Sequence, residues 1–463
     1  MTEAPWTNRI YGALRHPDEP AVLLVQVDGA WTLPAVSLEE VWLSSMGKIV
    51  PAFAGLLDLP VWGLRQFHYL RDGETRRMEM IVELERIDGS RVLPDGGRWA
   101  GAAEIERIDL AAEIPVRPLL RYLRALESGE MPPQRPPWAR PGWLPGVRRW
   151  ITAALGGQGV RVLEIKPFKQ WGISCVLHVL TDTGDYYFKT TNRNMPLFVN
   201  EALMTVFLAE RFPGAVPRPV AAEPGEDWML LAAFSETFRG AVAPEIRNHI
   251  FERFARLQIE SVPLAEALLA AGAIDRRLPV LAGQIEQLLV DPGATALLEA
   301  PDRVRIQAML PLFRWMIARL AGFGIPDALV HGDMHLGNAA RIDDRLVFFD
   351  WTDTAIAPPF FDLMSLGWMD LDAAAGPLNA YLDVWKDFLP HENLDEAVLL
   401  ARVLLNLHHA VSYQHIMKHL EPDSRIELNE THWFLKEAAV MATEFLSRYP
   451  GPDGSTPVEA PES

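Results

Sequence analysis

The chain has 463 residues, of which 49% are hydrophobic and 22% charged, and this balance excludes a largely disordered protein. Its 43 basic and 61 acidic residues give a formal net charge of −18, which disfavours nonspecific binding to nucleic acid or anionic lipid because the long-range field repels phosphate. The single cysteine, Cys175, excludes an intrachain disulfide and a cysteine-based zinc site. No signal-like leader and no run of 18 apolar residues is found, so we expect a cytoplasmic protein without a membrane segment.

The first part of the chain reads as an α+β domain over residues 1–126. Alternation and β-branched residues predict strands over 21–27 and 78–87, each followed by an Asp-Gly turn. Helices are predicted over 38–57 and 110–129.

Proline marks the clearest boundary. Six prolines lie between Pro132 and Pro145, where they cannot be held in a helix or a central strand. Residues 127–145 are therefore predicted to be a linker between the first domain and the rest. The acidic, Pro- and Gly-rich residues 449–463 are expected to be a disordered tail.

Beyond the linker, the pattern predicts a small antiparallel sheet lobe over residues 146–240, followed by a helical lobe over residues 241–448. The predicted elements of the first lobe are a helix at 141–155, strands at 161–168, 173–181 and 186–191, a helix at 201–211 and a strand at 228–234. From residue 243 the spacing is helical, except between residues 328 and 350.

The sharpest chemical signal is LVHGDMHLGNAARIDDRLVFFDW at residues 329–351. Asn338 follows Asp333 by five residues, and Asp350 ends the next predicted strand. Mg²⁺ prefers oxygen ligands and is usually held by one or two carboxylates together with substrate phosphates, so Asn338 and Asp350 are candidate ligands. Asp333 has no metal to hold in this arrangement and can orient a hydroxyl and accept its proton.

A nucleotide-binding site also needs a positively charged side chain to bind the phosphate groups, and a candidate lies earlier in the chain. Lys189 lies in the aromatic strand YYFKTT, and Glu201 opens a helix twelve residues later, where it can pair with the lysine. Phosphoryl transfer requires positioning and charge neutralisation more than covalent chemistry, and a lysine, two metal ligands and a base supply these.

Together, HGDMHLGN and the strand-end Asp350 resemble the aminoglycoside phosphotransferase and choline kinase family, relatives of the protein kinases, over about residues 145–445. The resemblance implies an α+β, two-lobed protein-kinase-like fold. It implies that Asp333 is the catalytic base, that Asn338 and Asp350 hold Mg²⁺, and that Lys189 binds phosphate with Glu201 as its partner.

The same resemblance assigns supporting roles. Asp362 would support the catalytic loop from the first turn of a helix, with His331 and His335 as structural members of that loop. The hairpin KPFKQWGISC, which contains the single glycine Gly172, would cover the nucleotide. His408, Tyr413 and Trp433 would line the acceptor site, because the helical lobe supplies substrate contacts in that family.

The histidines His415 and His419 leave an alternative open. They are four residues apart on one predicted helix, a spacing that can bind zinc, but no third ligand is evident. A structural or pocket-lining role is the preferred interpretation.

The opening of the first domain, AVLLVQVDGAWTLPAVSLEEVW, resembles a Nudix fold. A Nudix hydrolase gathers Mg²⁺ with several glutamates on the following helix, whereas only Glu39 and Glu40 are present here. We therefore expect a non-catalytic, Nudix-like binding or interaction module. Because the predicted nucleotide-binding residues lie beyond the linker, removing this domain is expected to leave nucleotide binding intact.

The leading functional hypothesis is a small-molecule kinase that transfers the γ-phosphoryl group of ATP or GTP, with Mg²⁺, to a hydroxyl acceptor. The net charge favours a cationic acceptor. The alternative is a kinase-like scaffold that senses a nucleotide or metabolite and recruits a protein partner through its Nudix-like domain. A protein kinase is disfavoured, because only eleven residues separate Asp350 from Asp362, too few for an activation segment.

Overall fold

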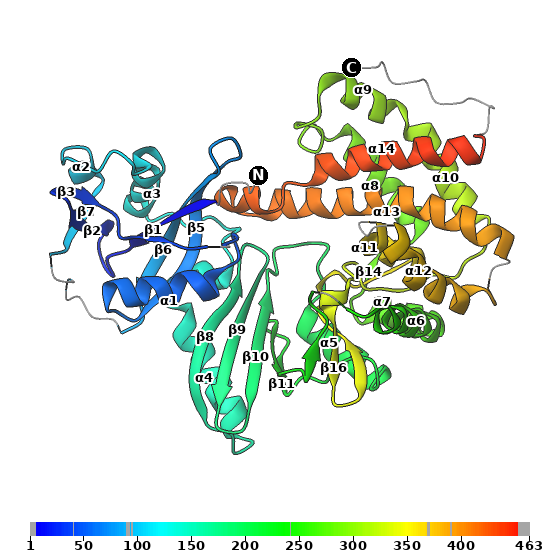
Figure 1. The fold of residues 1–463 in the computed structure, drawn as a ribbon, viewed down its shortest axis with the longest axis horizontal. Coiled ribbons are helices and arrows are strands. Elements are labelled where there is room, and N and C mark those ends of the chain that lie inside the picture. Colours follow the sequence, from blue (N-terminus) through cyan, green and yellow to red (C-terminus); the bar gives the residue numbers. More distant parts are fainter. Residues whose placement is uncertain are drawn as a thin grey trace. The chain divides into compact units, whose positions relative to one another are not determined.

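The computed structural model describes residues 6–451 except for 40, 89–92, 94–95, 241, 368–370 and 389–390. The chain is a mixed α+β protein in which small sheets precede a large helical region, and this confirms the predicted fold class (Figure 1). Its contacts form two compact units, Met1–Asn194 with His419–Glu427 and Met195–Lys418 with Leu428–Ser463. These units do not coincide with the predicted domain boundaries, which stay predictions. Most of the predicted disordered tail lies outside the described residues.

Two small sheets build the N-terminal domain. One has the order β4-β1-β6-β5 and the other β3-β2-β7, with β1 and β6 paired in parallel. Both predicted strands are confirmed, as β2 and β6. The strands are β1 (Thr7–Leu14), β2 (Ala21–Val27), β3 (Ala30–Thr32), β4 (Ala35–Ser37), β5 (Val61–Asp72), β6 (Arg77–Arg86) and β7 (Arg98–Gly101).

The helices of this domain are shorter than predicted. The predicted helix over 38–57 begins only at Met46, as α1 (Met46–Leu57), because the preceding chain forms β4 and pairs with β1. Likewise α3 (Val116–Ser128) begins after Pro115 and ends at Gly129, whose φ of 67° suits a glycine cap. A four-residue helix, α2 (Ala102–Ile105), was not predicted.

The described residues do not establish the Nudix-like assignment, which stays a prediction. Glu39 is exposed and precedes α1, whose first turn carries no acidic residue. Glu40 lies outside the described residues.

The first unit also contains α4 (Trp143–Gly156) and the antiparallel strands β8 (Val162–Gln170), β9 (Ser174–Thr181) and β10 (Asp185–Thr191), which match the predicted helix and three strands (Figure 1). Helix α1 packs directly on β8: a Cβ at Gly47 would lie 2.8 Å from the carbonyl oxygen of Phe168. The N-terminal domain and these strands therefore share one packed unit.

The predicted linker is a packed segment in the structure. Residues Pro137–Ala139 form the short helix η1, and Trp138 is only 1% exposed. Its indole Nε1 donates to the carbonyl oxygen of Trp171 at 2.9 Å. The expectation that these prolines exclude helix is wrong at two positions, because Pro137 begins η1 and Pro145 lies in the first turn of α4 (Trp143–Gly156), where a proline is tolerated. The segment is also packed and not free in solvent.

A short segment from far along the chain completes the first unit. Residues His419–Glu427 lie in sequence between α13 (His391–His419) and α14 (Thr431–Arg448), and they include the helix η6 (Pro422–Glu427). The Glu421 carboxylate forms a two-point ion pair with Arg135 and lies 3.3 Å from Arg65. All three side chains are at least nine-tenths buried, so the segment is held by desolvated charges.

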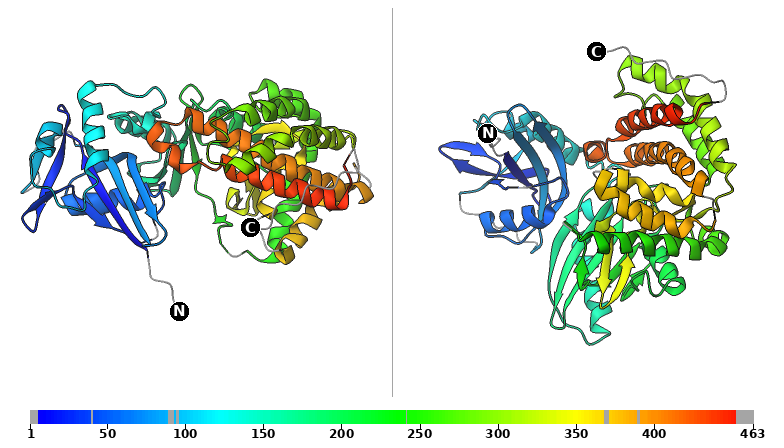
Figure 2. Two further views of the ribbon diagram at one scale, coloured as in Figure 1. Left: turned by 90° about the horizontal axis from the view of Figure 1, so that it is seen from above. Right: turned by 45° about the vertical axis from the view of Figure 1, so that its right-hand side comes forward.

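The second unit is mainly helical. It starts with α5 (Glu201–Arg211) and the antiparallel strands β11 (Ala221–Glu223) and β12 (Trp228–Ala232). In Figure 2 the long helices α13 and α14 run side by side, and rings of the two helices contact each other where Phe434 meets His409 and Tyr413. Further strands are β13 (Glu236–Thr237), β14 (Ile274–Asp275), β15 (Ala328–Val330), β16 (Ala339–Ile342), β17 (Arg345–Phe348) and β18 (Ala355–Ala357). Further helices are α6 (Pro244–Ser261), α7 (Ala265–Ala270), α8 (Leu278–Val290), α9 (Ala300–Ala308), α10 (Leu310–Ala321), α11 (Met364–Gly367) and α12 (Leu371–Trp385).

Two three-stranded sheets of the second unit flank the sequence motif. Their orders are β14-β18-β15 and β13-β16-β17. The motif therefore starts at the end of one sheet, passes through the other, and reaches Asp350 just after β17. Within the described part of the chain, no helix is both long and apolar enough to cross a membrane.

We predict that Glu421→Gln lowers the free energy of unfolding by about 3 kcal/mol, because it leaves the buried Arg135 guanidinium without its carboxylate. Urea denaturation measures this change. The matched control is Glu252→Gln, which breaks an exposed pair with Arg256 and should cost less than about 0.5 kcal/mol. Equal costs for the two variants would contradict the stabilising role of the buried pair.

Candidate active site

A buried carboxyl group supports the loop that follows β15. Asp362, in the helix η5 (Pro359–Leu363), is 2% exposed and accepts hydrogen bonds from the backbone N–H groups of His331 at 2.8 Å and Gly332 at 2.9 Å. Burial raises the pKa of Asp362 to about 7, although these two hydrogen bonds act to lower it. The contact predicted between Asp362 and the catalytic loop is thus present.

Two residues that sequence reasoning missed complete the support. Gln258 of α6 donates to Asp362 at 3.0 Å, and the Tyr381 hydroxyl of α12 donates in turn to the Gln258 side-chain oxygen. All three side chains are buried. The only signal in the sequence is the polar glutamine between the apolar Leu257 and Ile259 of a helix, which is too common to single out.

His331 is fully buried beneath the loop. Its Nε2 lies 2.9 Å from the carbonyl oxygen of Phe349, and its Nδ1 lies 3.4 Å from the backbone nitrogen of Asp333. The tautomer with a proton on Nε2 satisfies both contacts. Burial lowers the pKa of His331, so the ring is neutral and joins the loop to the strand end before Asp350.

Asp333 lies at the exposed rim of this loop, with 54% of its side chain accessible, where a substrate can reach it. His335 Nε2 lies 3.6 Å from an Asp333 carboxylate oxygen, and its Nδ1 accepts from the backbone N–H of Gly337. The nearby Asp333 carboxylate raises the pKa of His335, although burial acts to lower it. The histidine therefore orients the aspartate and balances part of its charge.

Asn338 is tied to the same aspartate. Its Nδ2 donates to the Asp333 carbonyl oxygen at 2.8 Å and approaches the Asp333 carboxylate at 3.3 Å. This fixes the amide so that its oxygen faces away from Asp333. The Asn338 carbonyl accepts from the backbone N–H of Phe349, which brings Asn338 beside the residue that precedes Asp350.

Asp350 adopts a left-handed backbone conformation, with φ 70° and ψ 58°, which is uncommon for a residue other than glycine. The turn is held from α5: both Glu201 oxygens accept, one from the Trp351 N–H at 3.1 Å and one from the Thr352 hydroxyl at 2.8 Å. The Thr352 oxygen also lies 3.2 Å from an Asp350 oxygen. Aspartate adopts this conformation more readily than most residues, and the contacts with Glu201 and Thr352 fix it here.

The role of Glu201 in holding the turn after Asp350 was not predicted. Lys189 lies on β10 in the first unit, whereas Glu201 begins α5 in the second. The pairing of these two residues stays a prediction.

As a magnesium site, these side chains fit by donor chemistry. The Asn338 amide nitrogen is fixed by Asp333, and Asp350 directly follows Phe349, whose backbone N–H donates to the Asn338 backbone carbonyl. No group of three or more His, Cys, Asp or Glu side chains suited to a metal occurs among the described residues, which include His415 and His419. A metal held by Asn338 and Asp350 would therefore need ligand atoms from a bound nucleotide.

The predicted acceptor-lining residues occupy different environments. Tyr413 of α13 lies within electrostatic range of Asp333: burial, and then the charges of Asp333, Asp353 and Glu430, raise its pKa. His408 is 4% exposed, and its ring packs against Phe361. Trp433 instead lines a pocket that also includes Leu363, Met364, Arg402, Asn406 and Glu437.

Two further residues pack against the same part of the second unit: His409, which belongs to the histidine cluster expected to be structural or to line a pocket, and Arg276, which the sequence analysis did not single out. His409 is buried, which lowers its pKa to about 4 although the charge of Asp333 acts to raise it. Arg276 is 2% exposed and donates to the His408 carbonyl at 2.8 Å and to the Ser412 hydroxyl at 3.0 Å. Burial lowers the pKa of Arg276 to about 9, although the Asp353 charge opposes this. Arg276 is thus bound to α13, and we call the buried face formed by Arg276, His408 and His409 the α13 wall.

Comparison with known proteins defines the class. The model of the phosphotransferase enzyme family matches residues 164–408, more than half of the chain. The chain therefore belongs to this family of phosphotransferases, as its HGD loop predicted. Among curated protein sequences, none matches this chain.

Solved structures similar to this chain include phosphotransferases and kinases for small molecules. The macrolide 2′-phosphotransferase MphH from Brachybacterium faecium is 17% identical, with a TM-score of 0.41, over 61% of this chain and 96% of its own. The choline kinase LicA from Streptococcus pneumoniae is 13% identical, with a TM-score of 0.44, over 64% and 99%. A choline/ethanolamine kinase family protein from Mesorhizobium loti is 14% identical, with a TM-score of 0.41, over 63% and 90%.

A pH dependence follows from Asp362. Its pKa of about 7 in the folded protein exceeds the ordinary value of 3.8, so the folded state binds the proton more tightly than the unfolded state. The stability that this proton contributes is fully present below about pH 4 and is lost as the pH rises towards 7. We predict that the free energy of unfolding of the natural protein falls relative to that of Asp362→Asn over this range. Denaturation curves at several pH values measure the difference, and a constant difference would contradict the prediction.

Proposed function

We propose that this chain is a Mg²⁺-dependent kinase that transfers the γ-phosphoryl group of ATP or GTP to a hydroxyl group of a small-molecule acceptor. The observation that carries the proposal is the Asp333 loop. An accessible carboxylate is held by Asn338 and His335, and the backbone beneath it is held by Asp362. Family membership supports the reaction class.

In this proposal Asp333 is the catalytic base. Its carboxylate orients the acceptor hydroxyl and accepts its proton as the phosphoryl group is transferred. His335 and Asn338 hold the carboxylate in position, so that little reorganisation is needed when the acceptor binds. His331, which is neutral, and Asp362 hold the backbone of the Asp333 loop and do not touch the substrate in this proposal.

Asn338 and Asp350 are the proposed magnesium ligands, through the Asn338 amide oxygen and the Asp350 carboxylate. A bound Mg²⁺ ion would neutralise phosphate charge. Lys189 is the proposed phosphate-binding cation. Glu201 and Thr352 hold the turn at Asp350. We propose that this turn directs the Asp350 carboxylate toward the same metal ion as Asn338.

For the acceptor, we propose a site bounded by Tyr413 and His409 near Asp333. The acidic groups that influence Tyr413, namely Asp333, Asp353 and Glu430, favour an acceptor with a cationic group. His408 belongs to the buried α13 wall behind this site. Trp433 lines a separate pocket, so it would contact only an acceptor large enough to reach that pocket. The sensing scaffold is the weaker candidate, because the family is one of enzymes.

The function is tested by thermal-shift measurements with ATP, GTP and Mg²⁺, followed by a panel of amines, sugars and antibiotics that bear hydroxyl groups. A ligand that binds only the folded state raises the midpoint of unfolding. Nucleotide release that depends on one acceptor class would establish the kinase. Nucleotide binding without turnover on any acceptor would favour the sensor.

We predict that Asp333→Asn leaves the dissociation constant for the nucleotide nearly unchanged but lowers kcat by about a hundredfold or more, because the amide cannot accept the acceptor proton. Steady-state kinetics and calorimetry measure the two quantities. Asp343→Asn, on the exposed turn between β16 and β17, is the matched control and should retain activity. Full turnover by Asp333→Asn would remove this residue from the base role.

We predict that Asp350→Ala abolishes the magnesium dependence of nucleotide binding, because Asn338 alone cannot hold the ion against the phosphates. Calorimetry with and without Mg²⁺ measures the effect. In the unmutated protein, equal nucleotide affinity under the two conditions would contradict the magnesium site and favour the sensor.

A further inference from the structure

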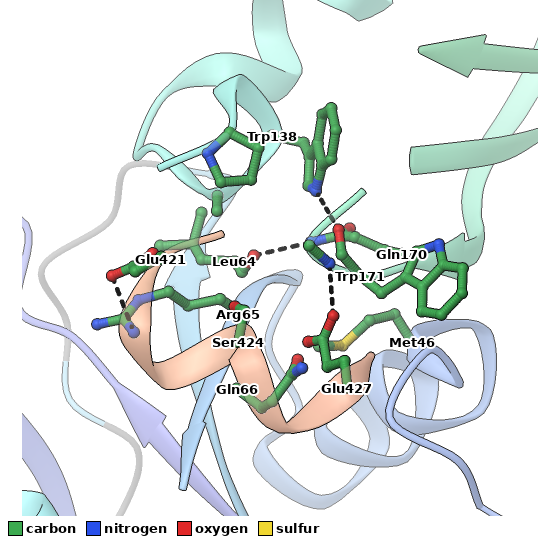
Figure 3. Close-up of a pocket in the computed structure, with 13 residues that line it drawn as sticks. Met46, Leu64, Arg65, Gln66, Trp138, Gln170, Trp171, Glu421, Ser424 and Glu427 are labelled. Atoms are coloured by element: carbon green, nitrogen blue, oxygen red, sulfur yellow. Dashed lines mark hydrogen bonds and ion pairs between the residues drawn. The ribbon is translucent and has the colours of Figure 1, made fainter. Parts of the chain in front are cut away.

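The tip of the β8–β9 hairpin, Gln170-Trp171-Gly172, is bound on several sides within the first unit (Figure 3). The side chain of Gln170 donates to the carbonyl oxygens of Gly63 at 2.7 Å and Leu64 at 2.9 Å, both on β5 of the N-terminal domain. Its backbone N–H donates to the Ser44 carbonyl at 3.1 Å. Hydrogen bonds from one residue therefore join the hairpin to two segments of the N-terminal domain.

Gly172 contacts the segment that contains η6. Its N–H donates to a Glu427 carboxylate oxygen at 2.8 Å. A Cβ on Gly172 would lie 2.6 Å from a terminal carbon of the Leu420 side chain, 3.1 Å from a Glu427 carboxylate oxygen and 3.3 Å from the Ser424 Cβ, so a larger residue would require these side chains to move. The glycine is required here for close packing, and its φ is not positive.

The Glu427 carboxyl group that accepts this hydrogen bond is itself buried. Its second oxygen, Oε1, is buried and has no hydrogen-bond partner among the described residues. Gln66 lines the same small pocket, and its Nε2 also lacks a partner in the described part of the chain. Burial raises the pKa of Glu427 to about 8, although the Gly172 N–H acts to lower it.

The segment that carries Glu427 is itself bound to the N-terminal domain. Arg65 of β5 contacts Glu421 and Asp423, and Arg135 of the proline-rich segment contacts Glu421. The hairpin, the proline-rich segment, η6 and β5 therefore form one continuous network. We call Gly63, Leu64, Trp138 and Glu427, which bind the hairpin tip, the hairpin clamp.

We propose that the hairpin clamp holds the nucleotide-covering hairpin in its binding conformation, with Glu427 as a positioning residue, and that nucleotide binding consequently requires the N-terminal domain. This inference rests on the proposed kinase function, in which the β8–β9 hairpin covers the nucleotide. It replaces the expectation that removing the first domain leaves nucleotide binding intact.

The physical reason is the entropy of the hairpin tip. A mobile loop must be ordered when ligand binds, and that cost reduces affinity, whereas a loop already held by the protein contributes no such cost. Because Glu427 does not touch the substrate in this proposal, its loss raises the KM for the nucleotide without changing kcat.

The test compares Glu427→Ala, which removes the acceptor of the Gly172 N–H, with Glu427→Gln, which keeps an oxygen acceptor. With a pKa of about 8 the carboxyl group is largely neutral at pH 7, so glutamine resembles it in charge as well as in shape. The control is Glu444→Ala on the exposed face of α14, where the acid pairs only with Arg448 among the contacts described for it. All variants are made in the full chain.

We expect Glu427→Ala to raise the KM and the dissociation constant for ATP by about tenfold, the loss typical of one hydrogen bond to a carboxyl group, with kcat unchanged. Hydrogen exchange in peptides that cover residues 170–174 should become faster. Glu427→Gln should restore both quantities to within about twofold of the natural protein, and Glu444→Ala should change neither.

Unchanged or tighter nucleotide binding by Glu427→Ala would overturn the proposal. If Glu427→Ala does not fold, Trp138→Phe decides instead: it removes the indole N–H that binds the Trp171 carbonyl but keeps an aromatic ring, and it should produce the same rise in KM and faster exchange. An unchanged KM in that variant would likewise overturn the proposal. Failure of the unmutated protein to bind any nucleotide would refute the kinase function itself, which is a separate result.

Discussion

The candidate active site depends on one buried carboxyl group. Asp362 accepts the backbone N–H groups of two successive residues, His331 and Gly332, at the point where the chain leaves β15. A backbone N–H that is buried without a partner costs as much as a lost hydrogen bond, so this carboxyl group determines the direction in which the chain continues. Asp333, the next residue, is thereby directed to the exposed rim while its backbone stays fixed.

The glycine between these residues shows how tight the arrangement is. Gly332 has a φ of 82°, and a Cβ there would lie 2.6 Å from both the side chain and the carbonyl oxygen of Asp353. The positive φ and the close approach each require glycine. The HGD sequence is therefore explained by three separate needs: a neutral imidazole that bridges to Phe349, a residue without a side chain, and an accessible carboxylate.

Much of this site could be predicted from the sequence, because its residues are close together in the chain. The spacing of Asp333, Asn338 and Asp350 follows from a loop and a two-stranded turn, which are local structures. Gln258 and Tyr381 could not be found in this way. Gln258 reaches Asp362 from a helix 104 residues before it, and Tyr381 supports Gln258 from a helix 19 residues after Asp362. A buried polar residue in a helix has no pattern that reveals its partner.

The fold shows the same division between local and distant information. Strand alternation and helical periodicity predicted β2, β6, β8, β9 and α5, whereas α1 began later than predicted because β4 uses the preceding residues to pair with β1. Proline content predicted a linker over 127–145, but it indicated neither that η1 and the first turn of α4 lie in this range nor that Trp138 would be buried.

The most consequential arrangement that the sequence did not indicate is the return of residues 419–427 to the first unit. These nine residues follow a long helix and precede another, so their composition suggests only a connecting loop. Their position depends on Glu421 meeting Arg65 and Arg135, which lie almost three hundred residues or more before it. Removing two arginines and a glutamate from water is favourable only where each finds its partner, so this network specifies one position for the segment.

Because Gly172 of the hairpin packs against that segment, the ion pairs of Glu421 with Arg65 and Arg135 help to determine where the tip of the β8–β9 hairpin lies. Under the proposed function, the N-terminal domain acts on nucleotide binding through the geometry of this single loop.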